Sequence, residues 1–227
     1  MAILVFSSVC ESDAPYSRMS AKSPFVSLSR ASSQNGLNDA IKKDLQYVDK
    51  NVIGSFAARY GIDFRLILAM IKQESRFNQN AQSGRGAMGL MQLMPETHLE
   101  IMEEIDIQDP YLPEENLRAG VYYVSKLSEL FKGVKGADKM SLTLAAYNAG
   151  PSRIYDAQEL AAYLGEDPHS WSSIRNMLPL LSKRFYSLHQ AVWGTSRPPN
   201  GYYGGANQTV KYVDSIMKTY GQYCQPA

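Results

Sequence analysis

The segment over residues 62–75 combines apolar and polar residues at helical spacing and carries a glutamate, Glu74, next to its last residue. At about 3.6 residues per turn, Glu74 falls on the same helix face as Ile67 and Met70, the face expected to be buried. A carboxylate is costly there unless it is protonated or partnered, and desolvation raises its pKa. Glu74 is therefore either held in a structural network or is a general acid that stays protonated near neutral pH.

The composition is that of a globular protein with a sizeable core. The chain has 227 residues, 44% hydrophobic and 11% aromatic, enough for one large domain or one domain plus a tail. A net charge of +1 gives no sign of an electrostatic nucleic-acid binder. No apolar run reaches about 18 residues, so no membrane-spanning helix is expected.

The cysteines and histidines show no metal-ligand spacing. Cys10 and Cys224 lie near opposite ends of the chain, and a disulfide between them stays open. Zinc and EF-hand patterns are both missing from the sequence, so no metal and no cofactor is predicted. His98, His169 and His189 are interpreted as surface or packing residues.

Residues 1–36 are predicted to be a disordered tail. From residue 11 onward they are rich in Ser, Ala, Asn and Pro without an apolar period, so they cannot bury enough surface to offset the entropy of ordering. The apolar start before Cys10 looks like the end of an export signal with a lipidated cysteine. It lacks a basic beginning, and Val9 is larger than the small residue that such signals usually carry before the cysteine.

Residues 37–227 are predicted to form a single, mainly α domain. Residues 182–207 are predicted as a long loop, and 77–92 is a loop by composition and the one candidate for a small β-ribbon. Helices are predicted over residues 38–60, 62–76, 95–104, 114–131, 141–149, 154–164, 171–181 and 209–220.

Three local motifs occur together in this domain. They are Glu74–Asn78 followed by Ser83–Pro95, then Leu144–Pro151, then Gln208–Val213. Over about residues 50–220 the chain resembles the family 1 lytic transglycosylases, bacterial enzymes that cleave peptidoglycan glycan strands. The resemblance implies the lysozyme-like α+β fold of the goose type. Residues 167–182 look most like the membrane-bound F-type branch, whose members usually carry a solute-binding-type domain before the catalytic one.

The resemblance gives Glu74 the role of acid and then base at the β-1,4 bond between N-acetylmuramic acid and N-acetylglucosamine. The motifs supply no second carboxylate. In a transglycosylase the sugar's own N-acetyl group stabilises the positive charge at C1, and its C6 hydroxyl attacks to give a 1,6-anhydro end. That second step is intramolecular, which accelerates it by orders of magnitude.

The resemblance also implies which residues line the sugar subsites. Plain structural roles stay open for them: a loop hydroxyl, a surface amide, a core methionine, or a core tyrosine with a capping asparagine. Gly86 and Gly89 either permit close approach of a ligand or form an ordinary turn. The implied subsite residues are Ser83, Gln92, Met94, Tyr147, Asn148 and Gln208.

Other aromatic and polar positions are less decided. Gln208 stands where relatives often have Glu. Tyr212 is interpreted as a core or a groove residue. Trp193, Tyr202 and Tyr203 either stack on sugars or pack the domain edge.

Two rival functions accompany this reading. A hydrolytic muramidase of the same fold would need a water-activating carboxylate, for which Asp63, Glu96 and Glu103 are candidates. A non-catalytic peptidoglycan-binding module should have lost the acid, whereas Glu74 is present. The expected partners are peptidoglycan glycan strands and no nucleic acid, for a monomer in the periplasm or cell envelope, with outer-membrane association through the N-terminus.

Overall fold

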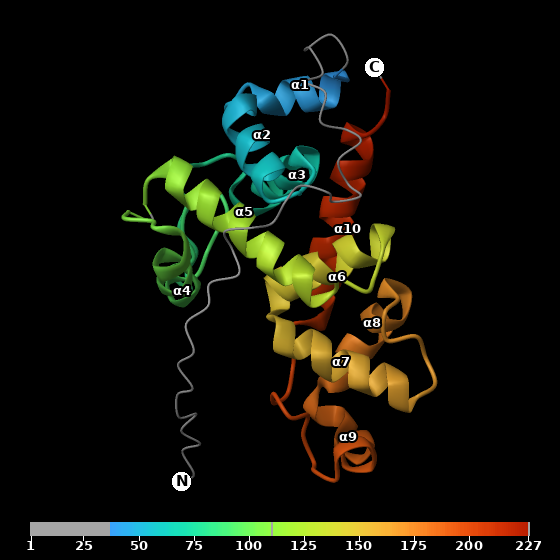
Figure 1. Ribbon diagram of the computed structural model, residues 1–227. Coiled ribbons are helices and arrows are strands. Elements are labelled where there is room, and N and C mark those ends of the chain that lie inside the picture. Colours follow the sequence, from blue (N-terminus) through green and yellow to red (C-terminus); the bar gives the residue numbers. More distant parts are fainter. Residues whose placement is uncertain (1–36, 110, 227) are drawn as a thin grey trace. The chain divides into compact units, whose positions relative to one another are not determined.

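The computed structural model describes residues 37–109 and 111–226, so the predictions about the first 36 residues and Cys10 lie outside the described part. The described residues form helices and no regular strand (Figure 1). The helices are α1 (Asp39–Leu45), α2 (Lys50–Arg59), α3 (Phe64–Ser75), α4 (Pro95–Ile105), α5 (Pro113–Leu130), α6 (Gly136–Ala149), α7 (Pro151–Tyr163), α8 (Trp171–Met177), α9 (Tyr186–Trp193) and α10 (Ala206–Tyr223), with 3-10 turns η4 (Leu178–Leu181) and η5 (Lys183–Phe185).

Helices α3 and α6 form the centre of the core. Residues 66–71 of α3 and 141–146 of α6 are all buried, so both helices are covered on every side. Helix α10 packs against both of them (Figure 1). Its buried residues recur every three or four positions, which gives it one apolar face and leaves the opposite face exposed.

Two buried or half-buried aspartates fasten the end of α10 to the neighbouring helices. Asp44 on α1 accepts hydrogen bonds from the Tyr223 hydroxyl and from Lys72 Nζ, the latter at 2.8 Å. Asp63 caps the N-terminus of α3 and accepts a hydrogen bond from the Tyr220 hydroxyl at 3.0 Å. Because Lys72 lies on α3, these bonds fix α10 against both α1 and α3.

The predicted helix over residues 38–60 is wrong as a single element, because the chain breaks between α1 and α2. Asp49 caps α2, accepting a hydrogen bond from Asn51 N at 2.7 Å, and its backbone is extended. Tyr47 leaves the helical path and stacks on Phe77, with ring centroids 5.4 Å apart. Apolar residues keep a helical spacing across the break, so periodicity alone does not reveal that Asp49 caps a new helix.

The predicted long loop over residues 182–207 is also wrong in part, because it contains η5 and α9. Within α9, the rings of His189 and Trp193 lie one turn apart with centroids 5.7 Å apart. His189 is fully buried, so a polar residue occupies a core position and weakens the apolar pattern that periodicity detects. Gly194 ends the helix in the left-handed conformation.

Several smaller details also differ from the sequence predictions, among them the starts of α7 at Pro151 and of α10 at Ala206. Helix α6 begins earlier than predicted, at Gly136. The predicted helix over 171–181 is α8 continued by η4, which contains Pro179. The candidate ribbon over 77–92 is reduced to isolated bridges that pair Met88 with Gln82 and with Leu93.

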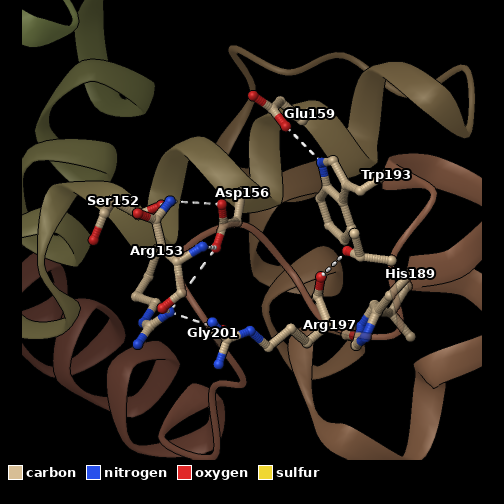
Figure 2. Close-up of polar contacts among 11 residues, drawn as sticks. Ser152, Arg153, Asp156, Glu159, His189, Trp193, Arg197 and Gly201 are labelled. Atoms are coloured by element: carbon tan, nitrogen blue, oxygen red, sulfur yellow. Dashed lines mark hydrogen bonds and ion pairs between the residues drawn. The ribbon is translucent and has the colours of Figure 1, made fainter. Parts of the chain in front are cut away.

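Figure 2 shows how helix α7 holds the segment that leads into α10. Asp156 is 1% exposed and accepts hydrogen bonds from Asn200 Nδ2 at 2.7 Å and Asn200 N at 3.3 Å. Arg153 donates to the backbone carbonyls of Asn200 and Gly201. One turn further along α7, Glu159 accepts a hydrogen bond from Trp193 Nε1 at 2.6 Å (Figure 2).

The aromatic residues of the segment are held by hydrogen bonds within the domain. Trp193 is tied to α7, and the Tyr202 hydroxyl donates to the Ser196 carbonyl at 3.0 Å. Tyr203 shares a 2.5 Å hydrogen bond with the Thr209 hydroxyl. The contacts of all three support packing of the domain edge, and stacking of these rings on sugars stays a prediction.

Asp156 should contribute to stability through the hydrogen bonds that its two carboxyl oxygens accept from Asn200. Burial raises the pKa of this carboxyl. We expect Asp156→Ala to lower the free energy of unfolding by about 2 kcal/mol, since Asn200 N loses its acceptor and Asn200 Nδ2 keeps only its 3.3 Å bond to the Ser152 carbonyl. Asp156→Asn keeps one acceptor oxygen but turns an NH2 group toward the other Asn200 donor, so its loss should be smaller, about 1 kcal/mol. Urea denaturation at pH 7 measures both, and equal losses in the two variants would contradict this account.

Candidate active site

Glu74 lies in the last turn of α3, where a buried helix reaches the surface of the domain. Its side chain is half-buried, and its Oε1 accepts a 2.5 Å hydrogen bond from the Tyr212 hydroxyl of α10. Arg76 and Phe77, which follow α3, have φ values of 51° and 68°. Left-handed backbone is unfavourable for residues with a side chain, and consecutive cases of this kind cluster at functional sites.

Burial raises the pKa of the Glu74 carboxyl from 4.5 to about 7, and the hydrogen bond from Tyr212 opposes this rise without cancelling it. No nearby charge contributes to the shift. The pKa of the Tyr212 hydroxyl is raised well above its ordinary value, first by burial and then by the nearby Glu74. A substantial fraction of Glu74 is therefore protonated at neutral pH, and Tyr212 stays a neutral donor beside it.

Tyr147 connects the Glu74 region to the loop before α4. Burial and then the Glu74 charge raise the pKa of its hydroxyl well above the ordinary value, which places this ring near Glu74. The hydroxyl donates to the Met91 carbonyl at 2.7 Å, and the ring lies against Tyr123 with centroids 5.5 Å apart. The hydrogen bond from Tyr147 to Met91 thus joins the second sequence motif, Leu144–Pro151, to the Ser83–Pro95 part of the first.

The loop over residues 81–94 is held by Asn116, which the sequence analysis missed. Asn116 is fully buried on α5; its Oδ1 accepts from Met91 N and its Nδ2 donates to the Met88 carbonyl, both at 3.0 Å. Its Nδ2 also lies 3.2 Å from Nε2 of the buried His98. A polar residue on the apolar face of α5 was the available signal, since such residues need internal partners.

Within this loop, the predicted subsite residues make local contacts. Gln92 has a φ of 47°, and its Nε2 donates to the carbonyls of Gly89 and Ala81 at 2.9 and 3.0 Å. Ser83 Oγ accepts from Ala87 N at 2.9 Å. Met94 is half-buried and precedes α4 as its N-cap residue. The hydrogen bonds of the described residues join none of Ser83, Gln92 and Met94 to Glu74, so their roles at the sugar stay predictions.

A groove with a volume of about 530 Å³ lies on the α10 side of Glu74. It brings together Asn148, Gln208 and Tyr212, two of which are predicted subsite residues from different motifs. Asn148 Oδ1 accepts from the Thr209 hydroxyl at 2.7 Å, which fixes the end of α6 against α10. The lining residues are Gln73, Asn148, Asn207, Gln208, Lys211, Tyr212 and Ser215.

The candidate second carboxylates lie elsewhere. Asp63 caps the opposite end of α3, eleven residues from Glu74 and therefore about 16 Å away along the helix. It is occupied by Arg65, whose Nη2 lies 2.6 Å from Asp63 Oδ2. Glu96 and Glu103 are exposed on α4 and do not line the groove. Over residues 37–109 and 111–226, no cluster of three or more His, Cys, Asp or Glu residues could hold a metal ion.

Residues 51–168 match the family described as Transglycosylase SLT domain. The chain belongs to this family. The match covers α3, the loop with Gln92, and the AYN motif at Tyr147, but ends before α10 and Tyr212.

Named relatives of this transglycosylase SLT domain match over a longer stretch of the chain than the family model does. The chain is 36% identical over 170 residues to membrane-bound lytic murein transglycosylase F of Desulfosudis oleivorans, a match covering 74% of the chain and 35% of that protein. It is 35% identical over 161 residues to the protein of the same name from Shewanella pealeana, covering 70% and 31%. The chain thus spans about a third of the length of these relatives.

Solved structures agree on the lysozyme-like lytic transglycosylase fold. An inactive mutant of lytic transglycosylase Slt from Pseudomonas aeruginosa matches with a TM-score of 0.53 and 26% identity, over 77% of the chain and 24% of that protein. The 70-kDa soluble lytic transglycosylase of Escherichia coli also matches with a TM-score of 0.53, at 22% identity over 78% of the chain and 24% of that protein. The predicted fold class is confirmed.

Gly89 of the SLT domain tests the loop geometry. Its φ is 76°, and an added Cβ would lie 2.4 to 2.5 Å from the Asn116 side chain. We expect Gly89→Ala to lower the free energy of unfolding by about 3 kcal/mol, through backbone strain and overpacking. Gly84→Ala is the matched control in the same loop, because a Cβ there meets nothing within 4 Å. If thermal or urea unfolding gave the two variants equal stability, this would contradict the close contact between Gly89 and Asn116.

The pKa of Glu74 predicts how stability depends on pH. A folded-state pKa of about 7 against 4.5 means that ionisation of Glu74 destabilises the fold, an effect absent below about pH 4.5 and complete above about pH 7. Glu74→Gln stays neutral and can still accept the Tyr212 hydrogen bond. We expect it to be more stable than the wild type by about 2 kcal/mol at pH 8.5. The advantage should disappear at pH 4.5 in denaturation curves, and an advantage that did not depend on pH would refute the raised pKa.

Proposed function

We propose that this chain is a peptidoglycan lytic transglycosylase that cleaves the β-1,4 bond between N-acetylmuramic acid and N-acetylglucosamine and leaves 1,6-anhydro ends. Glu74 is the general acid and then the general base. The observation that carries the proposal is one partly buried carboxyl with a pKa of about 7, next to a groove rich in hydrogen-bonding groups. Membership of the SLT family and the names of the relatives support the same activity.

In the first step, the protonated Glu74 donates its proton to the glycosidic oxygen as the bond from C1 to that oxygen breaks. The leaving sugar departs with a hydroxyl group, and the positive charge that develops at C1 is stabilised by the substrate's N-acetyl group. A carboxyl with a pKa of about 7 suits this task, because it is protonated often enough near neutrality and still gives up its proton readily.

In the second step, the ionised Glu74 accepts the proton of the C6 hydroxyl of the same muramic acid. The C6 oxygen attacks C1, the 1,6-anhydro ring forms, and Glu74 returns to its starting state. Glu74 is ionised between the two steps, and the Tyr212 hydroxyl stabilises this carboxylate through its 2.5 Å hydrogen bond. Among the described residues no second carboxylate influences the pKa of Glu74, and the groove lining, which includes the neighbouring Gln73 but not Glu74 itself, contains no carboxylate. This favours the route over activation of a water molecule.

The groove explains how a sugar chain can be held without metal or charge at the reacting bond. Asn148 and Gln208 present amide groups on the lining, and amides donate and accept hydrogen bonds as sugar hydroxyl and acetamido groups do. Ser83, Gln92, Met94 and Tyr147 are proposed to complete the subsites from the loop side. The side-chain amide of Gln92, which donates to the carbonyls of both Ala81 and Gly89, makes that wall rigid.

The place of action follows from the proposed substrate. Peptidoglycan lies in the cell envelope, and the relatives from D. oleivorans and S. pealeana are named membrane-bound. No helix among the described residues is long and apolar enough to cross a bilayer. We propose envelope localisation, with attachment through a lipidated Cys10 as a separate prediction about the undescribed segment.

The decisive experiment digests purified sacculi with wild type and Glu74→Gln and identifies the products by mass spectrometry. We expect 1,6-anhydro ends from the wild type and a loss of rate of at least about a thousandfold in Glu74→Gln, because Gln cannot transfer a proton. The variant should still bind sacculi, since its shape is unchanged.

Other outcomes identify the rival functions. Reducing ends would show a hydrolytic muramidase, and absence of products with intact binding would show a binding module. Substantial cleavage by Glu74→Gln would refute the assignment of the acid. Circular dichroism of the variant serves as the control for folding.

A further inference from the structure

We propose that Lys211 selects glycan strands carrying a carboxylate beside the cleavage site, an inference that rests on the proposed function. The groove would thus bind an anionic substituent of the sugar chain as well as its hydroxyl and acetamido groups. The observation behind it is the single cation in a groove lining that is otherwise neutral.

The helical register of α10 places Lys211 in the groove wall. Gln208, Lys211, Tyr212 and Ser215 stand at positions i, i+3, i+4 and i+7, which share one face of a helix. All four line the groove, and Tyr212 of the same face contacts Glu74. The lysine side chain is therefore presented within one helical turn of the residue that bonds the proposed acid.

The charge of Lys211 is not neutralised within the described residues. It is exposed, and no ion pair or hydrogen bond to it occurs among residues 37–109 and 111–226. Asp214, the acid one turn further along α10, is instead paired with Arg175 at 2.9 Å. The groove lining contains amides, hydroxyls and this ammonium group but no carboxylate, so its preference is for an anion.

The proposed substrate offers two sources of such an anion. Each muramic acid carries a lactyl substituent that ends in a free carboxylate when the peptide is missing and in a stem peptide with its own carboxylates when it is present. The shared chemistry is a carboxylate attached to the sugar whose bond is broken. A lysine ammonium pairs with either source as a compact point charge.

Lys211 should influence binding and leave the acid–base chemistry unchanged. Burial and the Tyr212 hydrogen bond are the two influences on the pKa of Glu74, and Lys211 is not among them. A variant at Lys211 should therefore alter affinity while the pH dependence of cleavage keeps its midpoint.

The test measures the affinity of the full chain with Glu74→Gln, which prevents turnover, for three soluble glycans. The first carries free lactyl carboxylates, the second carries stem peptides, and the third is the first with its carboxylates converted to carboxamides. We expect Lys211→Gln to weaken binding of the carboxylate form about fivefold at low salt and to change the carboxamide form by less than about twofold. Weakening confined to the peptide-bearing glycan would assign the carboxylate to the peptide.

Two further variants sharpen the test. Lys218→Gln is the matched control, because this exposed lysine lies on the same helix but does not line the groove, and it should change neither affinity. Gln208→Glu places a carboxylate three residues before Lys211 and should weaken the carboxylate form as Lys211→Gln does, with the lysine still present.

The outcomes separate this inference from the proposed function. If Lys211→Gln weakens the carboxylate and carboxamide forms equally, or weakens binding of none of the three glycans, the inference is overturned even where the wild type releases anhydro products. If the wild type releases no products but the carboxylate preference depends on Lys211, the preference stands and the lytic activity fails.

Discussion

The hydrogen bond between Tyr212 and Glu74 joins residues 138 positions apart, and the candidate site depends on it. Glu74 belongs to the central helix α3 and Tyr212 to α10, which is fastened at its far end by the bonds of Tyr220 and Tyr223. A bond of 2.5 Å to a carboxyl in a desolvated position fixes both its orientation and its proton affinity. The site is therefore an interface between helices, and its chemistry depends on how they pack.

Polar contacts also hold the loop over residues 81–94, on the other side of the candidate site from α10. Asn116 holds the backbone of Met88 and Met91 from inside the core, and Tyr147 holds the Met91 carbonyl from α6. Both use backbone groups of the loop, so the loop's shape is maintained whatever its surface side chains contact. The left-handed backbone at Gln92 follows from this restraint, because packing and hydrogen bonds outweigh the local strain.

The distribution of charge around the site suits a single-acid mechanism. The acids of the surrounding helices are consumed by structural roles, as Asp63 is by Arg65 and Asp44 by Lys72. The groove lining is left with amides, hydroxyls and Lys211. Burial raises the pKa of the Glu74 carboxyl and the Tyr212 hydrogen bond lowers it, and no charged neighbour among the described residues contributes. Binding and proton transfer are assigned to different residues as a result.

The sequence by itself determined the helical class, the family, and Glu74 as the candidate acid, because each is written locally in apolar spacing and short motifs. It also placed Asn148 and Gln208 in separate motifs, and only the structure shows that the two line one groove. It missed the break before Asp49 and helix α9, where a cap and the buried His189 interrupt or disguise the period.

Only the tertiary structure decided which partners the local signals meet. Tyr212 was either core or groove in the sequence and is both in the structure, buried along its ring and bonded to Glu74 at its hydroxyl. Asn116 was marked only as a polar residue on an apolar helix face, and Lys211 only as a member of the third motif, and neither signal named a partner. Their roles arise from packing between distant segments, and local spacing cannot specify such contacts because it records only which face of a helix a residue occupies.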